Sequence, residues 1–481
     1  MTNSLASSRP FQLPAPRLFR QEQLERVHEA ALRILLQHGI RVHYEPARQA
    51  AHRAGMRVVG DRVFPDQGRI DELLDQTRPS RAAESDEAEP EIEAEPDLWL
   101  TVPKYCEFIH DLDSDDVVPI TTESLIEATK LVDTMDPLRV TGSGPGAPHD
   151  VPAELQRLQQ YRISATYSRH GWRADMEEGS PRVFPYLMEM AEVLGHPPRQ
   201  HTIYVISPLS LGKWSFESLE AIRGRIESVS VSNMLSAGGS APVHLPGALA
   251  LAVAESIGSA IIVAEYSKLP VSWSVRVCPF DPRTMAMSLG SPEEFLFQRA
   301  SDEVNAWYHG WEPGAPNGML HTQSKLPDAQ AAAEKMSQMT LAAVCGARYF
   351  SGAGALSLDE VFSAEQLVID CELRDHVQRL VRGVGLDCDP ECCAAEVGEG
   401  LDLGFLGLES TARLYRSIYW LPRLFERRRF GGWQEGGKPR LSGRAKEIAR
   451  EQLGKHAFEL DATVRGRLDA VYARAERELA G

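Results

Sequence analysis

The chain has few cysteines and an excess of negative charge. Its 481 residues include seven cysteines, an odd number without the spacing of a disulfide scaffold, which predicts a reduced, cytoplasmic protein. The net charge of −17 argues against a nucleic-acid partner, because phosphate binding needs clustered lysine and arginine. Hydrophobic residues make up 43% of the chain, which is enough to bury a sizeable core.

We expect neither a signal peptide nor a membrane span in this sequence. The N-terminal MTNSLASSRPFQLPAP has no apolar core of the kind that directs secretion. No run approaches the ~20 apolar residues that span a bilayer. The longest apolar stretch, residues 248–264, contains Glu255 and small side chains, so we expect a buried helix and no membrane partner.

Familiar catalytic and cofactor motifs are absent as well. Neither H-E-x-x-H nor G-x-S-x-G occurs, and no catalytic residue can be named. The glycine-rich turns at 238–240 and 351–355 lack nucleotide-binding spacing, although a late loop of a barrel can bind phosphate. The sequence CDPECC at 388–393 has no nearby histidine and matches structural zinc poorly. We therefore predict no metal site and interpret CDPECC as part of a helix with small buried thiols.

From Leu98 onward, short apolar runs alternate with amphipathic stretches. Predicted strands lie near residues 138–142, 163–167, 202–207, 229–235, 271–277, 318–322, 349–352 and 403–406. Predicted helices lie at 122–134, 182–194, 215–226, 246–266, 292–308, 328–344 and 364–383. Eight strands with helices between them predict an α/β fold of the TIM (β/α)8 barrel type.

The same patterns divide the chain into three predicted parts. Residues 1–97 form an N-terminal extension with a helix at 21–38, short strands and an acidic insert. That insert, 84–97, holds eight acids and has little to bury, so it is interpreted as a solvated loop. Residues 98–440 form the predicted barrel, and residues 441–481 form C-terminal helices.

Two sequence blocks carry a family resemblance. Residues 236–294 open SAGGSAPVHLPGALALAVAES and close DPRTMAMSLGSPEE, and residues 323–355 read QSKLPDAQAAAEKMSQMTLAAVCGARYFSGAGA. With RVHEAALRILLQHGIRV before them and SAEQLVIDCEL after them, these motifs resemble the trimethylamine methyltransferase family in order and spacing. The chain contains only standard residues, so it resembles the non-pyrrolysine branch, which includes glycine betaine methyltransferase.

The resemblance implies a TIM-barrel methyltransferase that moves a methyl group from a quaternary or tertiary methylamine, betaine-like in type, to a corrinoid protein. On this implication the chain binds no cofactor directly, and a partner protein presents the corrinoid over the barrel mouth. We also expect a homo-oligomer. Two alternatives stay open: a non-catalytic sensor of methylated amines, and a barrel methyltransferase with a different donor or acceptor.

A methylammonium pocket needs aromatic faces, because a trimethylammonium group has at most one N–H to donate. Four residues at predicted strand ends are candidates for this wall, and two more would orient the substrate. The wall candidates are Tyr167, Tyr204, Trp273 and His321, and the orienting candidates are His170 and Gln323. Arg169, Arg276 and Arg283 are candidates for a substrate carboxylate. For each single residue, a place in the core or in a structural ion pair remains the alternative.

Overall fold

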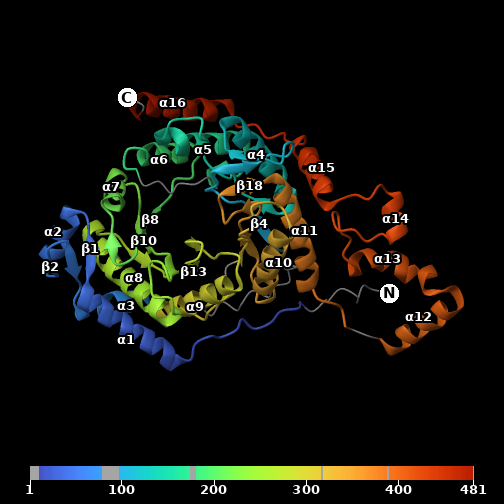
Figure 1. The fold of residues 1–481 in the computed structure, drawn as a ribbon, viewed down its shortest axis with the longest axis horizontal. Helices are drawn as coiled ribbons and strands as arrows, with labels where there is room; N and C mark the ends of the chain where they lie inside the picture. The colour runs from blue at the N-terminus through green and yellow to red at the C-terminus, as the bar shows by residue number, and fades with distance from the viewer. Residues whose placement is uncertain (1–9, 79–96, 174–179, 316–317, 387–388, 480–481) are drawn as a thin grey trace.

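A computed structural model describes residues 10–78, 97–173, 180–315, 318–386 and 389–479. Two parallel sheets lie at its centre (Figure 1). The first has the strand order β15 (Gly318–Met319), β16 (Tyr349–Ser351), β4 (Trp99–Thr101), β7 (Val140–Thr141). The second has the order β12 (Val271–Trp273), β10 (Ser228–Ser232), β8 (Gln200–Tyr204). Because the strands are parallel, the carboxyl ends of each sheet share one edge.

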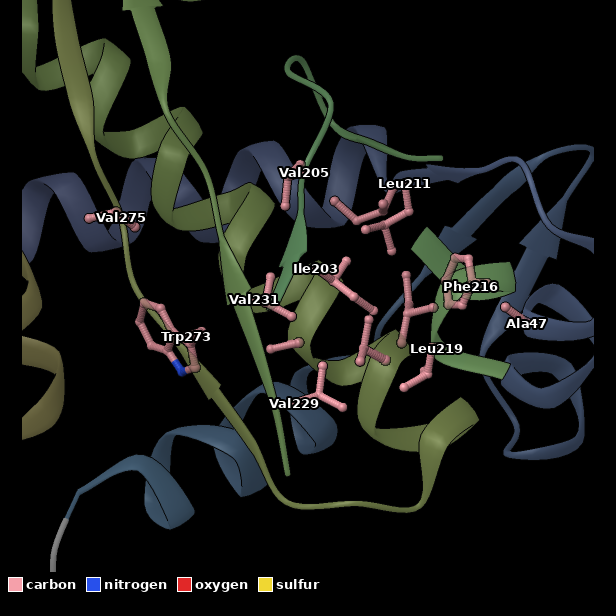
Figure 2. Close-up of a cluster of buried hydrophobic side chains, with 14 of the residues drawn as sticks. Ala47, Ile203, Val205, Leu211, Phe216, Leu219, Val229, Val231, Trp273 and Val275 are labelled. Carbon is pink, nitrogen blue, oxygen red and sulfur yellow. The ribbon is translucent and has the colours of Figure 1, made fainter. Parts of the chain in front are cut away.

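One face of the second sheet is buried against helices. Ile203, Val231 and Trp273 are neighbours across the three strands, and each is at most 2% exposed. Figure 2 shows these side chains in one cluster with Phe216 and Leu219 of α7. Side chains alternate between the two faces of a strand, so the residues between them face the opposite side.

Eight helices surround the two sheets in chain order (Figure 1). They are α4 (Thr122–Thr134), α5 (Ala153–Tyr167), α6 (Phe184–Val193), α7 (Lys213–Ala221), α8 (Leu245–Ser267), α9 (Pro292–His309), α10 (Ala329–Val344) and α11 (Ala364–Val381). All seven predicted helices are present with small shifts of their ends. Capping side chains explain several starts: Thr121, Asp328 and Ser363 each accept a hydrogen bond from a backbone N–H of the first turn.

Six of the predicted strands are found near their predicted positions, and two are wrong. Residues 163–167 belong to α5, and residues 403–406 lie at the end of α12 (Pro390–Leu403) and in the 3-10 turn Phe405–Gly407. The second half of α5 packs against α4 on one side and α16 on another, so it is buried almost all round. Periodicity does not distinguish such a run from a buried strand.

The pairing of the parallel strands stops at two places. Within the described residues, no ladder of hydrogen bonds joins β7 to β8 or β12 to β15. The first break falls at residues 168–173, which follow α5 and include the 3-10 turn Gly171–Arg173. The fold is therefore a mixed α/β arrangement of parallel sheets and surrounding helices.

The N-terminal part packs on the outside of α8. It contains α1 (Gln21–His38), β1 (Ile40–Val42), α2 (Glu45–Arg53), β2 (Arg57–Val59), β3 (Arg62–Phe64) and α3 (Gln67–Thr77). Strand β1 also pairs in parallel with β9 (Ser210–Leu211), which follows β8. This part shares one hydrophobic core with the second sheet. The acidic insert, apart from Asp97, lies outside the described residues.

The C-terminal helices cover another part of the ring (Figure 1). Helix α15 (Leu441–Leu453) packs on α4 and α11, and α16 (Ala462–Leu479) packs on α5 and α6. Before them, α12, α13 (Glu409–Ile418) and α14 (Phe430–Glu435) project from the ring. Cys392 and Cys393 on α12 are exposed, so the predicted burial of these thiols is wrong; Cys388 lies outside the described residues.

Two further sheets lie among the described residues. One consists of β11 (Leu235–Ala237), β13 (Val277–Asp281) and β14 (Ala286–Met287), and the other of β17 (Ala355–Leu356), β18 (Val361–Ser363), β5 (Phe108–His110) and β6 (Val117–Pro119). Strands β11 and β13 follow β10 and β12 along the chain and pair in parallel. The loops that leave the carboxyl ends of the second sheet are thereby held beside one another.

Helix α8 is the one described helix that is long and apolar enough to cross a membrane. Its most apolar 18-residue window has a mean hydropathy of 1.9, and 83% of that window is buried inside the protein. Burial from α1 and α2 on one side and the second sheet on the other accounts for its apolar composition. The predicted buried helix is confirmed.

Candidate functional site

Polar side chains at the carboxyl ends of both parallel sheets meet at one carboxylate, Glu294. His321 lies two residues past β15, and its Nδ1 is 2.5 Å from Glu294 Oε1. Arg276 lies three residues past β12, with a terminal guanidinium nitrogen 3.9 Å from the same oxygen. The Glu294 side chain is 3% exposed and that of Arg276 is 34% exposed. The cluster thus links the two sheets and presents a cation to solvent.

Local backbone structure places Glu294. It lies in the first turn of α9, where unpaired N–H groups favour a carboxylate. Its Oε2 accepts a hydrogen bond of 2.6 Å from the backbone N–H of Gly290. Gly290 has a φ of +90°, and a Cβ there would lie 3.0 Å from Thr322 Cα. Only glycine allows this turn to approach the loop that carries His321 so closely.

Helix α10 holds the loop that carries Gln323. The backbone N–H of Gln323 donates to Glu334 Oε2 over 2.8 Å, and the Thr322 hydroxyl donates to the same oxygen over 2.6 Å. The Gln323 side-chain amide donates to the carbonyl of Met287 over 2.6 Å. His321 and Gln323 therefore stand on a loop whose conformation is fixed by hydrogen bonds to α10 and to Met287.

A second buried carboxylate, Glu255 of α8, lies behind the ends of the second sheet. It accepts hydrogen bonds from the Ser207 hydroxyl (2.8 Å), the Leu209 backbone N–H (2.7 Å) and Asn233 Nδ2 (3.4 Å). Asn233 Oδ1 in turn accepts from the backbone N–H of Arg276 (3.1 Å). Burial raises the pKa of Glu255 to about 7, although the hydrogen bonds act to lower it.

Tyr204 lies at the same edge as Arg276. It ends β8, on the face opposite Ile203, and is 46% exposed. Its neighbour across the ladder is Ser232 of β10, and Ser230 precedes that residue on the same face. Both of these neighbours on the ladder have small side chains. Of the four predicted wall residues, Tyr204 is an exposed ring at the carboxyl end of a central strand.

Trp273 lies on the opposite face of the second sheet from Tyr204. It shares a face with Val231, and its ring lies 5.2 Å from that of Tyr308 in α9. The indole N–H donates to the Thr77 hydroxyl over 3.0 Å. Trp273 is therefore a core residue between the second sheet, α3 and α9, which corrects its predicted place beside Tyr204.

The other edge of Trp273 borders a separate cavity of about 260 Å³. The cavity is also lined by His309 and Trp311, whose rings stack 4.5 Å apart, and by Asp302. Burial raises the pKa of Asp302 to about 6. This cavity combines aromatic rings with a carboxylate, but none of the other predicted site residues lines it.

Tyr167 and His170 lie at the opposite end of the strands from His321. Tyr167 is the last residue of α5, not the end of a strand. His170 Nε2 is 2.7 Å from Oδ1 of Asp136, which lies between α4 and the start of β7. The amino end of β7 and the carboxyl end of β15 are opposite edges of one parallel sheet, so one small ligand does not reach both groups.

Two of the three arginines considered for a substrate carboxylate are paired with acids. Arg169 donates to both oxygens of Asp133, over 3.1 and 3.2 Å. Arg283 donates to Asp281 over 2.7 Å, and these hydrogen bonds lower the pKa of Asp281 to about 2. Arg276 has the loosest contact of the three with a carboxylate, which leaves it the best placed to bind another.

One cluster of potential metal ligands occurs among the described residues. Ligand atoms of His110, Asp115 and Glu365 lie within 4.8 Å of one another. The Lys446 ammonium forms an ion pair with Asp115 and lies 3.9 Å from Glu365. The Lys446 cation therefore already balances part of the charge of these two carboxylates.

The sequence analysis names His321, Gln323 and Arg276 but misses Glu294, Glu255 and Asn233. One signal for Glu255 is present in the sequence, because it is a lone acid in a long apolar stretch. A charge at such a position requires polar partners. Glu294 carries no comparable signal, since acids are common in the first turn of any helix.

The raised pKa of Glu255 predicts a loss of stability with rising pH. In the folded chain the pKa of Glu255 is about 7, whereas the ordinary pKa of a glutamate, which the unfolded chain has, is 4.5. Between pH 4.5 and about pH 7 the folded chain therefore binds more protons than the unfolded chain. The free energy of unfolding should therefore fall by about 3 kcal/mol from this group as the pH rises through that window. In Glu255→Gln this fall should be absent, as measured by urea unfolding at about pH 5 and about pH 8.

The exposed Glu447→Gln variant on α15 is the matched control and should keep the full pH dependence of the wild type. If Glu255→Gln and Glu447→Gln lose stability equally between the two pH values, Glu255 does not titrate in this window.

Comparison with known proteins places the chain in a family. The sequence model of the trimethylamine methyltransferase (MTTB) family matches residues 5–480. Glycine betaine methyltransferase of Desulfitobacterium hafniense (strain Y51) is 25% identical over 481 residues, covering 97% of this chain and 98% of that protein.

Two further relatives cover different shares of the chain. Trimethylamine methyltransferase MttB2 of Methanosarcina mazei is 33% identical over 258 residues, covering 52% of this chain and 50% of that protein. Proline betaine:corrinoid methyltransferase of Eubacterium limosum is 24% identical over 427 residues, covering 84% of this chain and 86% of that protein. With a family match that runs almost from end to end, this chain belongs to the trimethylamine methyltransferase family.

Proposed function

We propose that this chain is a methyltransferase that takes a methyl group from a betaine-like quaternary amine and passes it to a corrinoid held by a partner protein. Two relatives named for betaines align with 97% and 84% of the chain, whereas the trimethylamine enzyme MttB2 aligns with 52%. The single observation that carries the substrate class is the Arg276–Glu294 pair, which offers opposite charges at one strand edge.

The fold proposal is that the two parallel sheets are arcs of one TIM (β/α)8 barrel formed by residues 98–440. Eight helices follow one another around the sheets in chain order, as the barrel requires (Figure 1). Residues 168–173 would take the strand position between β7 and β8. Residues 1–97 and 441–481 would then be an extension and a helical tail on the outside of the barrel.

A betaine is a zwitterion, and the proposed pocket matches both of its ends. The Arg276 guanidinium is a fork-shaped donor that suits a carboxylate. The face of Tyr204 and the negative charge of Glu294 suit a trimethylammonium group. His321 and Gln323, fixed by Glu294 and α10, would orient the substrate between these two ends. Trimethylamine has no carboxylate, so Arg276 favours a betaine over it.

The rim around this pocket fits a partner that presents a corrinoid. Large apolar side chains are exposed on loops that follow the central strands, which is the kind of surface that packs against another protein. They are Ile206, Met234, Val243, Met285 and Leu326, each at least 47% exposed. The corrinoid, when bound, supplies the reduced cobalt that accepts a methyl group.

The chain itself then has little proton chemistry to perform. A quaternary ammonium that loses a methyl group leaves as a neutral tertiary amine, so no general acid is required. The work of Arg276, Tyr204 and His321 is to hold the substrate in one orientation and to keep water from the transferring methyl group. A sensor that binds betaines without transfer remains the alternative.

A homo-oligomer is part of the same proposal. The projecting helices α12–α14 expose Leu401, Leu406 and Phe430, each at least 70% accessible. Apolar side chains of this size are stabilised by a protein contact. Sedimentation velocity of the purified chain should give a species larger than 53.3 kDa, and a single species of that mass would exclude a stable oligomer.

The proposed function predicts that Arg276→Gln impairs methyl transfer from glycine betaine. Loss of a charge-assisted bidentate contact should raise KM on the order of 30-fold or more. The assay is methyl transfer to free cob(I)alamin under reducing conditions, with glycine betaine and trimethylamine compared. The trimethylamine rate, if measurable, should change little.

Arg283→Gln is the matched control, because Arg283 is 87% exposed on the following loop, and this variant should behave as the wild type. An Arg276→Gln variant with unchanged kinetics would remove Arg276 from the pocket. Binding of glycine betaine by the wild type without any transfer would favour the sensor.

A further inference from the structure

A groove at the amino end of the strands is lined by arginines. It has a volume of about 370 Å³ and lies between the second half of α11, the segment just before β7, the end of α13 and the chain that follows α13. Six arginines line it: Arg139, Arg374, Arg379, Arg382, Arg416 and Arg423. We call it the arginine groove. It lies at the opposite strand edge from His321 and Arg276.

Within the residues that the structure describes, acidic side chains balance only part of this charge. Arg374 donates to Asp375 over 2.8 Å. Arg139 and Arg382 share one carboxylate, Asp97, at 2.9 and 3.5 Å. Among the described residues, the ion pairs of these six arginines involve two carboxylates, although the chain as a whole carries a net charge of −17. The arginine groove is therefore a local concentration of positive charge on an acidic protein.

Three of the arginines form no ion pair within the described part of the chain. Arg379 donates to the carbonyl oxygens of Ile418 (2.8 Å) and Gly383 (2.7 Å), which fix its position and leave its charge unbalanced. Arg416 and Arg423 are exposed at the rim. Like charges gathered in this way repel one another, and a bound anion removes the repulsion.

We propose that the arginine groove binds a small molecule that carries two or more phosphate groups. Guanidinium forks bind phosphate oxygens in pairs, and the three unbalanced arginines supply more charge than a single phosphate needs. The volume of the groove falls in the range of small-molecule sites. The groove also includes Trp420 and Tyr419, so an aromatic group attached to the phosphates has rings to pack against. This inference does not depend on the proposed methyl transfer.

The test is isothermal titration calorimetry of the full chain with inorganic pyrophosphate at low salt. We expect a dissociation constant on the order of 100 µM or lower, and an increase of about tenfold or more in the double variant R416A/R423A. The matched control is R465A/R467A, which removes two exposed arginines from α16 and should bind as the wild type. The rim arginines are exposed and repel their neighbours, so the melting temperature of R416A/R423A should be no lower than that of the wild type.

Several outcomes would overturn the proposal. One is the absence of pyrophosphate binding to the wild type, and another is equal weakening in the two double variants. Orthophosphate that binds as tightly as pyrophosphate would exclude a need for two phosphates. A fourth arm uses a variant with the acids of residues 84–95 changed to amides. If this variant binds pyrophosphate and the wild type does not, the acidic insert occupies the groove, and the groove is not a site for a soluble ligand.

Discussion

The buried carboxylate of Glu294 is the constraint on which the site depends. A charge that is 3% exposed destabilises a fold by several kcal/mol unless it is paired and hydrogen-bonded. Gly290, His321 and Arg276 meet this need from three different loops. No ladder joins β12 to β15 within the described residues, so Glu294 connects the loops at a place where strand pairing does not. The same contacts bring the side chains of His321 and Arg276 together at Oε1 of Glu294.

The sequence predicts the helices better than the strands, for a physical reason. Helices such as α4 and α10 have capping side chains and long amphipathic patterns, which local interactions determine. The central strands contain only two to five residues, so their pattern is short. The wrongly predicted strand in α5 contains ISATY, whose small and β-branched residues suit a strand, and only its packing between α4 and α16 decides for a helix.

Individual site residues follow from the sequence, but their arrangement does not. His321, Gln323 and Arg276 stand near strand ends, and that position is visible in the pattern. The register of β12 beside β10 decides that Trp273 faces α9, and one residue of shift would have reversed it. Tyr167 and His170 are predicted in the site because residues 163–167 are predicted as a strand. Both lie at the strand edge opposite to His321. The partner of His321 comes from a distant helix and leaves no local signal.

The central claim is that opposite charges at the edge shared by Arg276, Glu294 and Tyr204 hold a betaine. A crystal structure of the chain with glycine betaine tests this most directly. The account predicts the carboxylate on the Arg276 guanidinium and the trimethylammonium group against Tyr204, on the Glu294 side. Glycine betaine in the cavity between Trp273, Trp311 and Asp302, with nothing bound at Arg276, would contradict it.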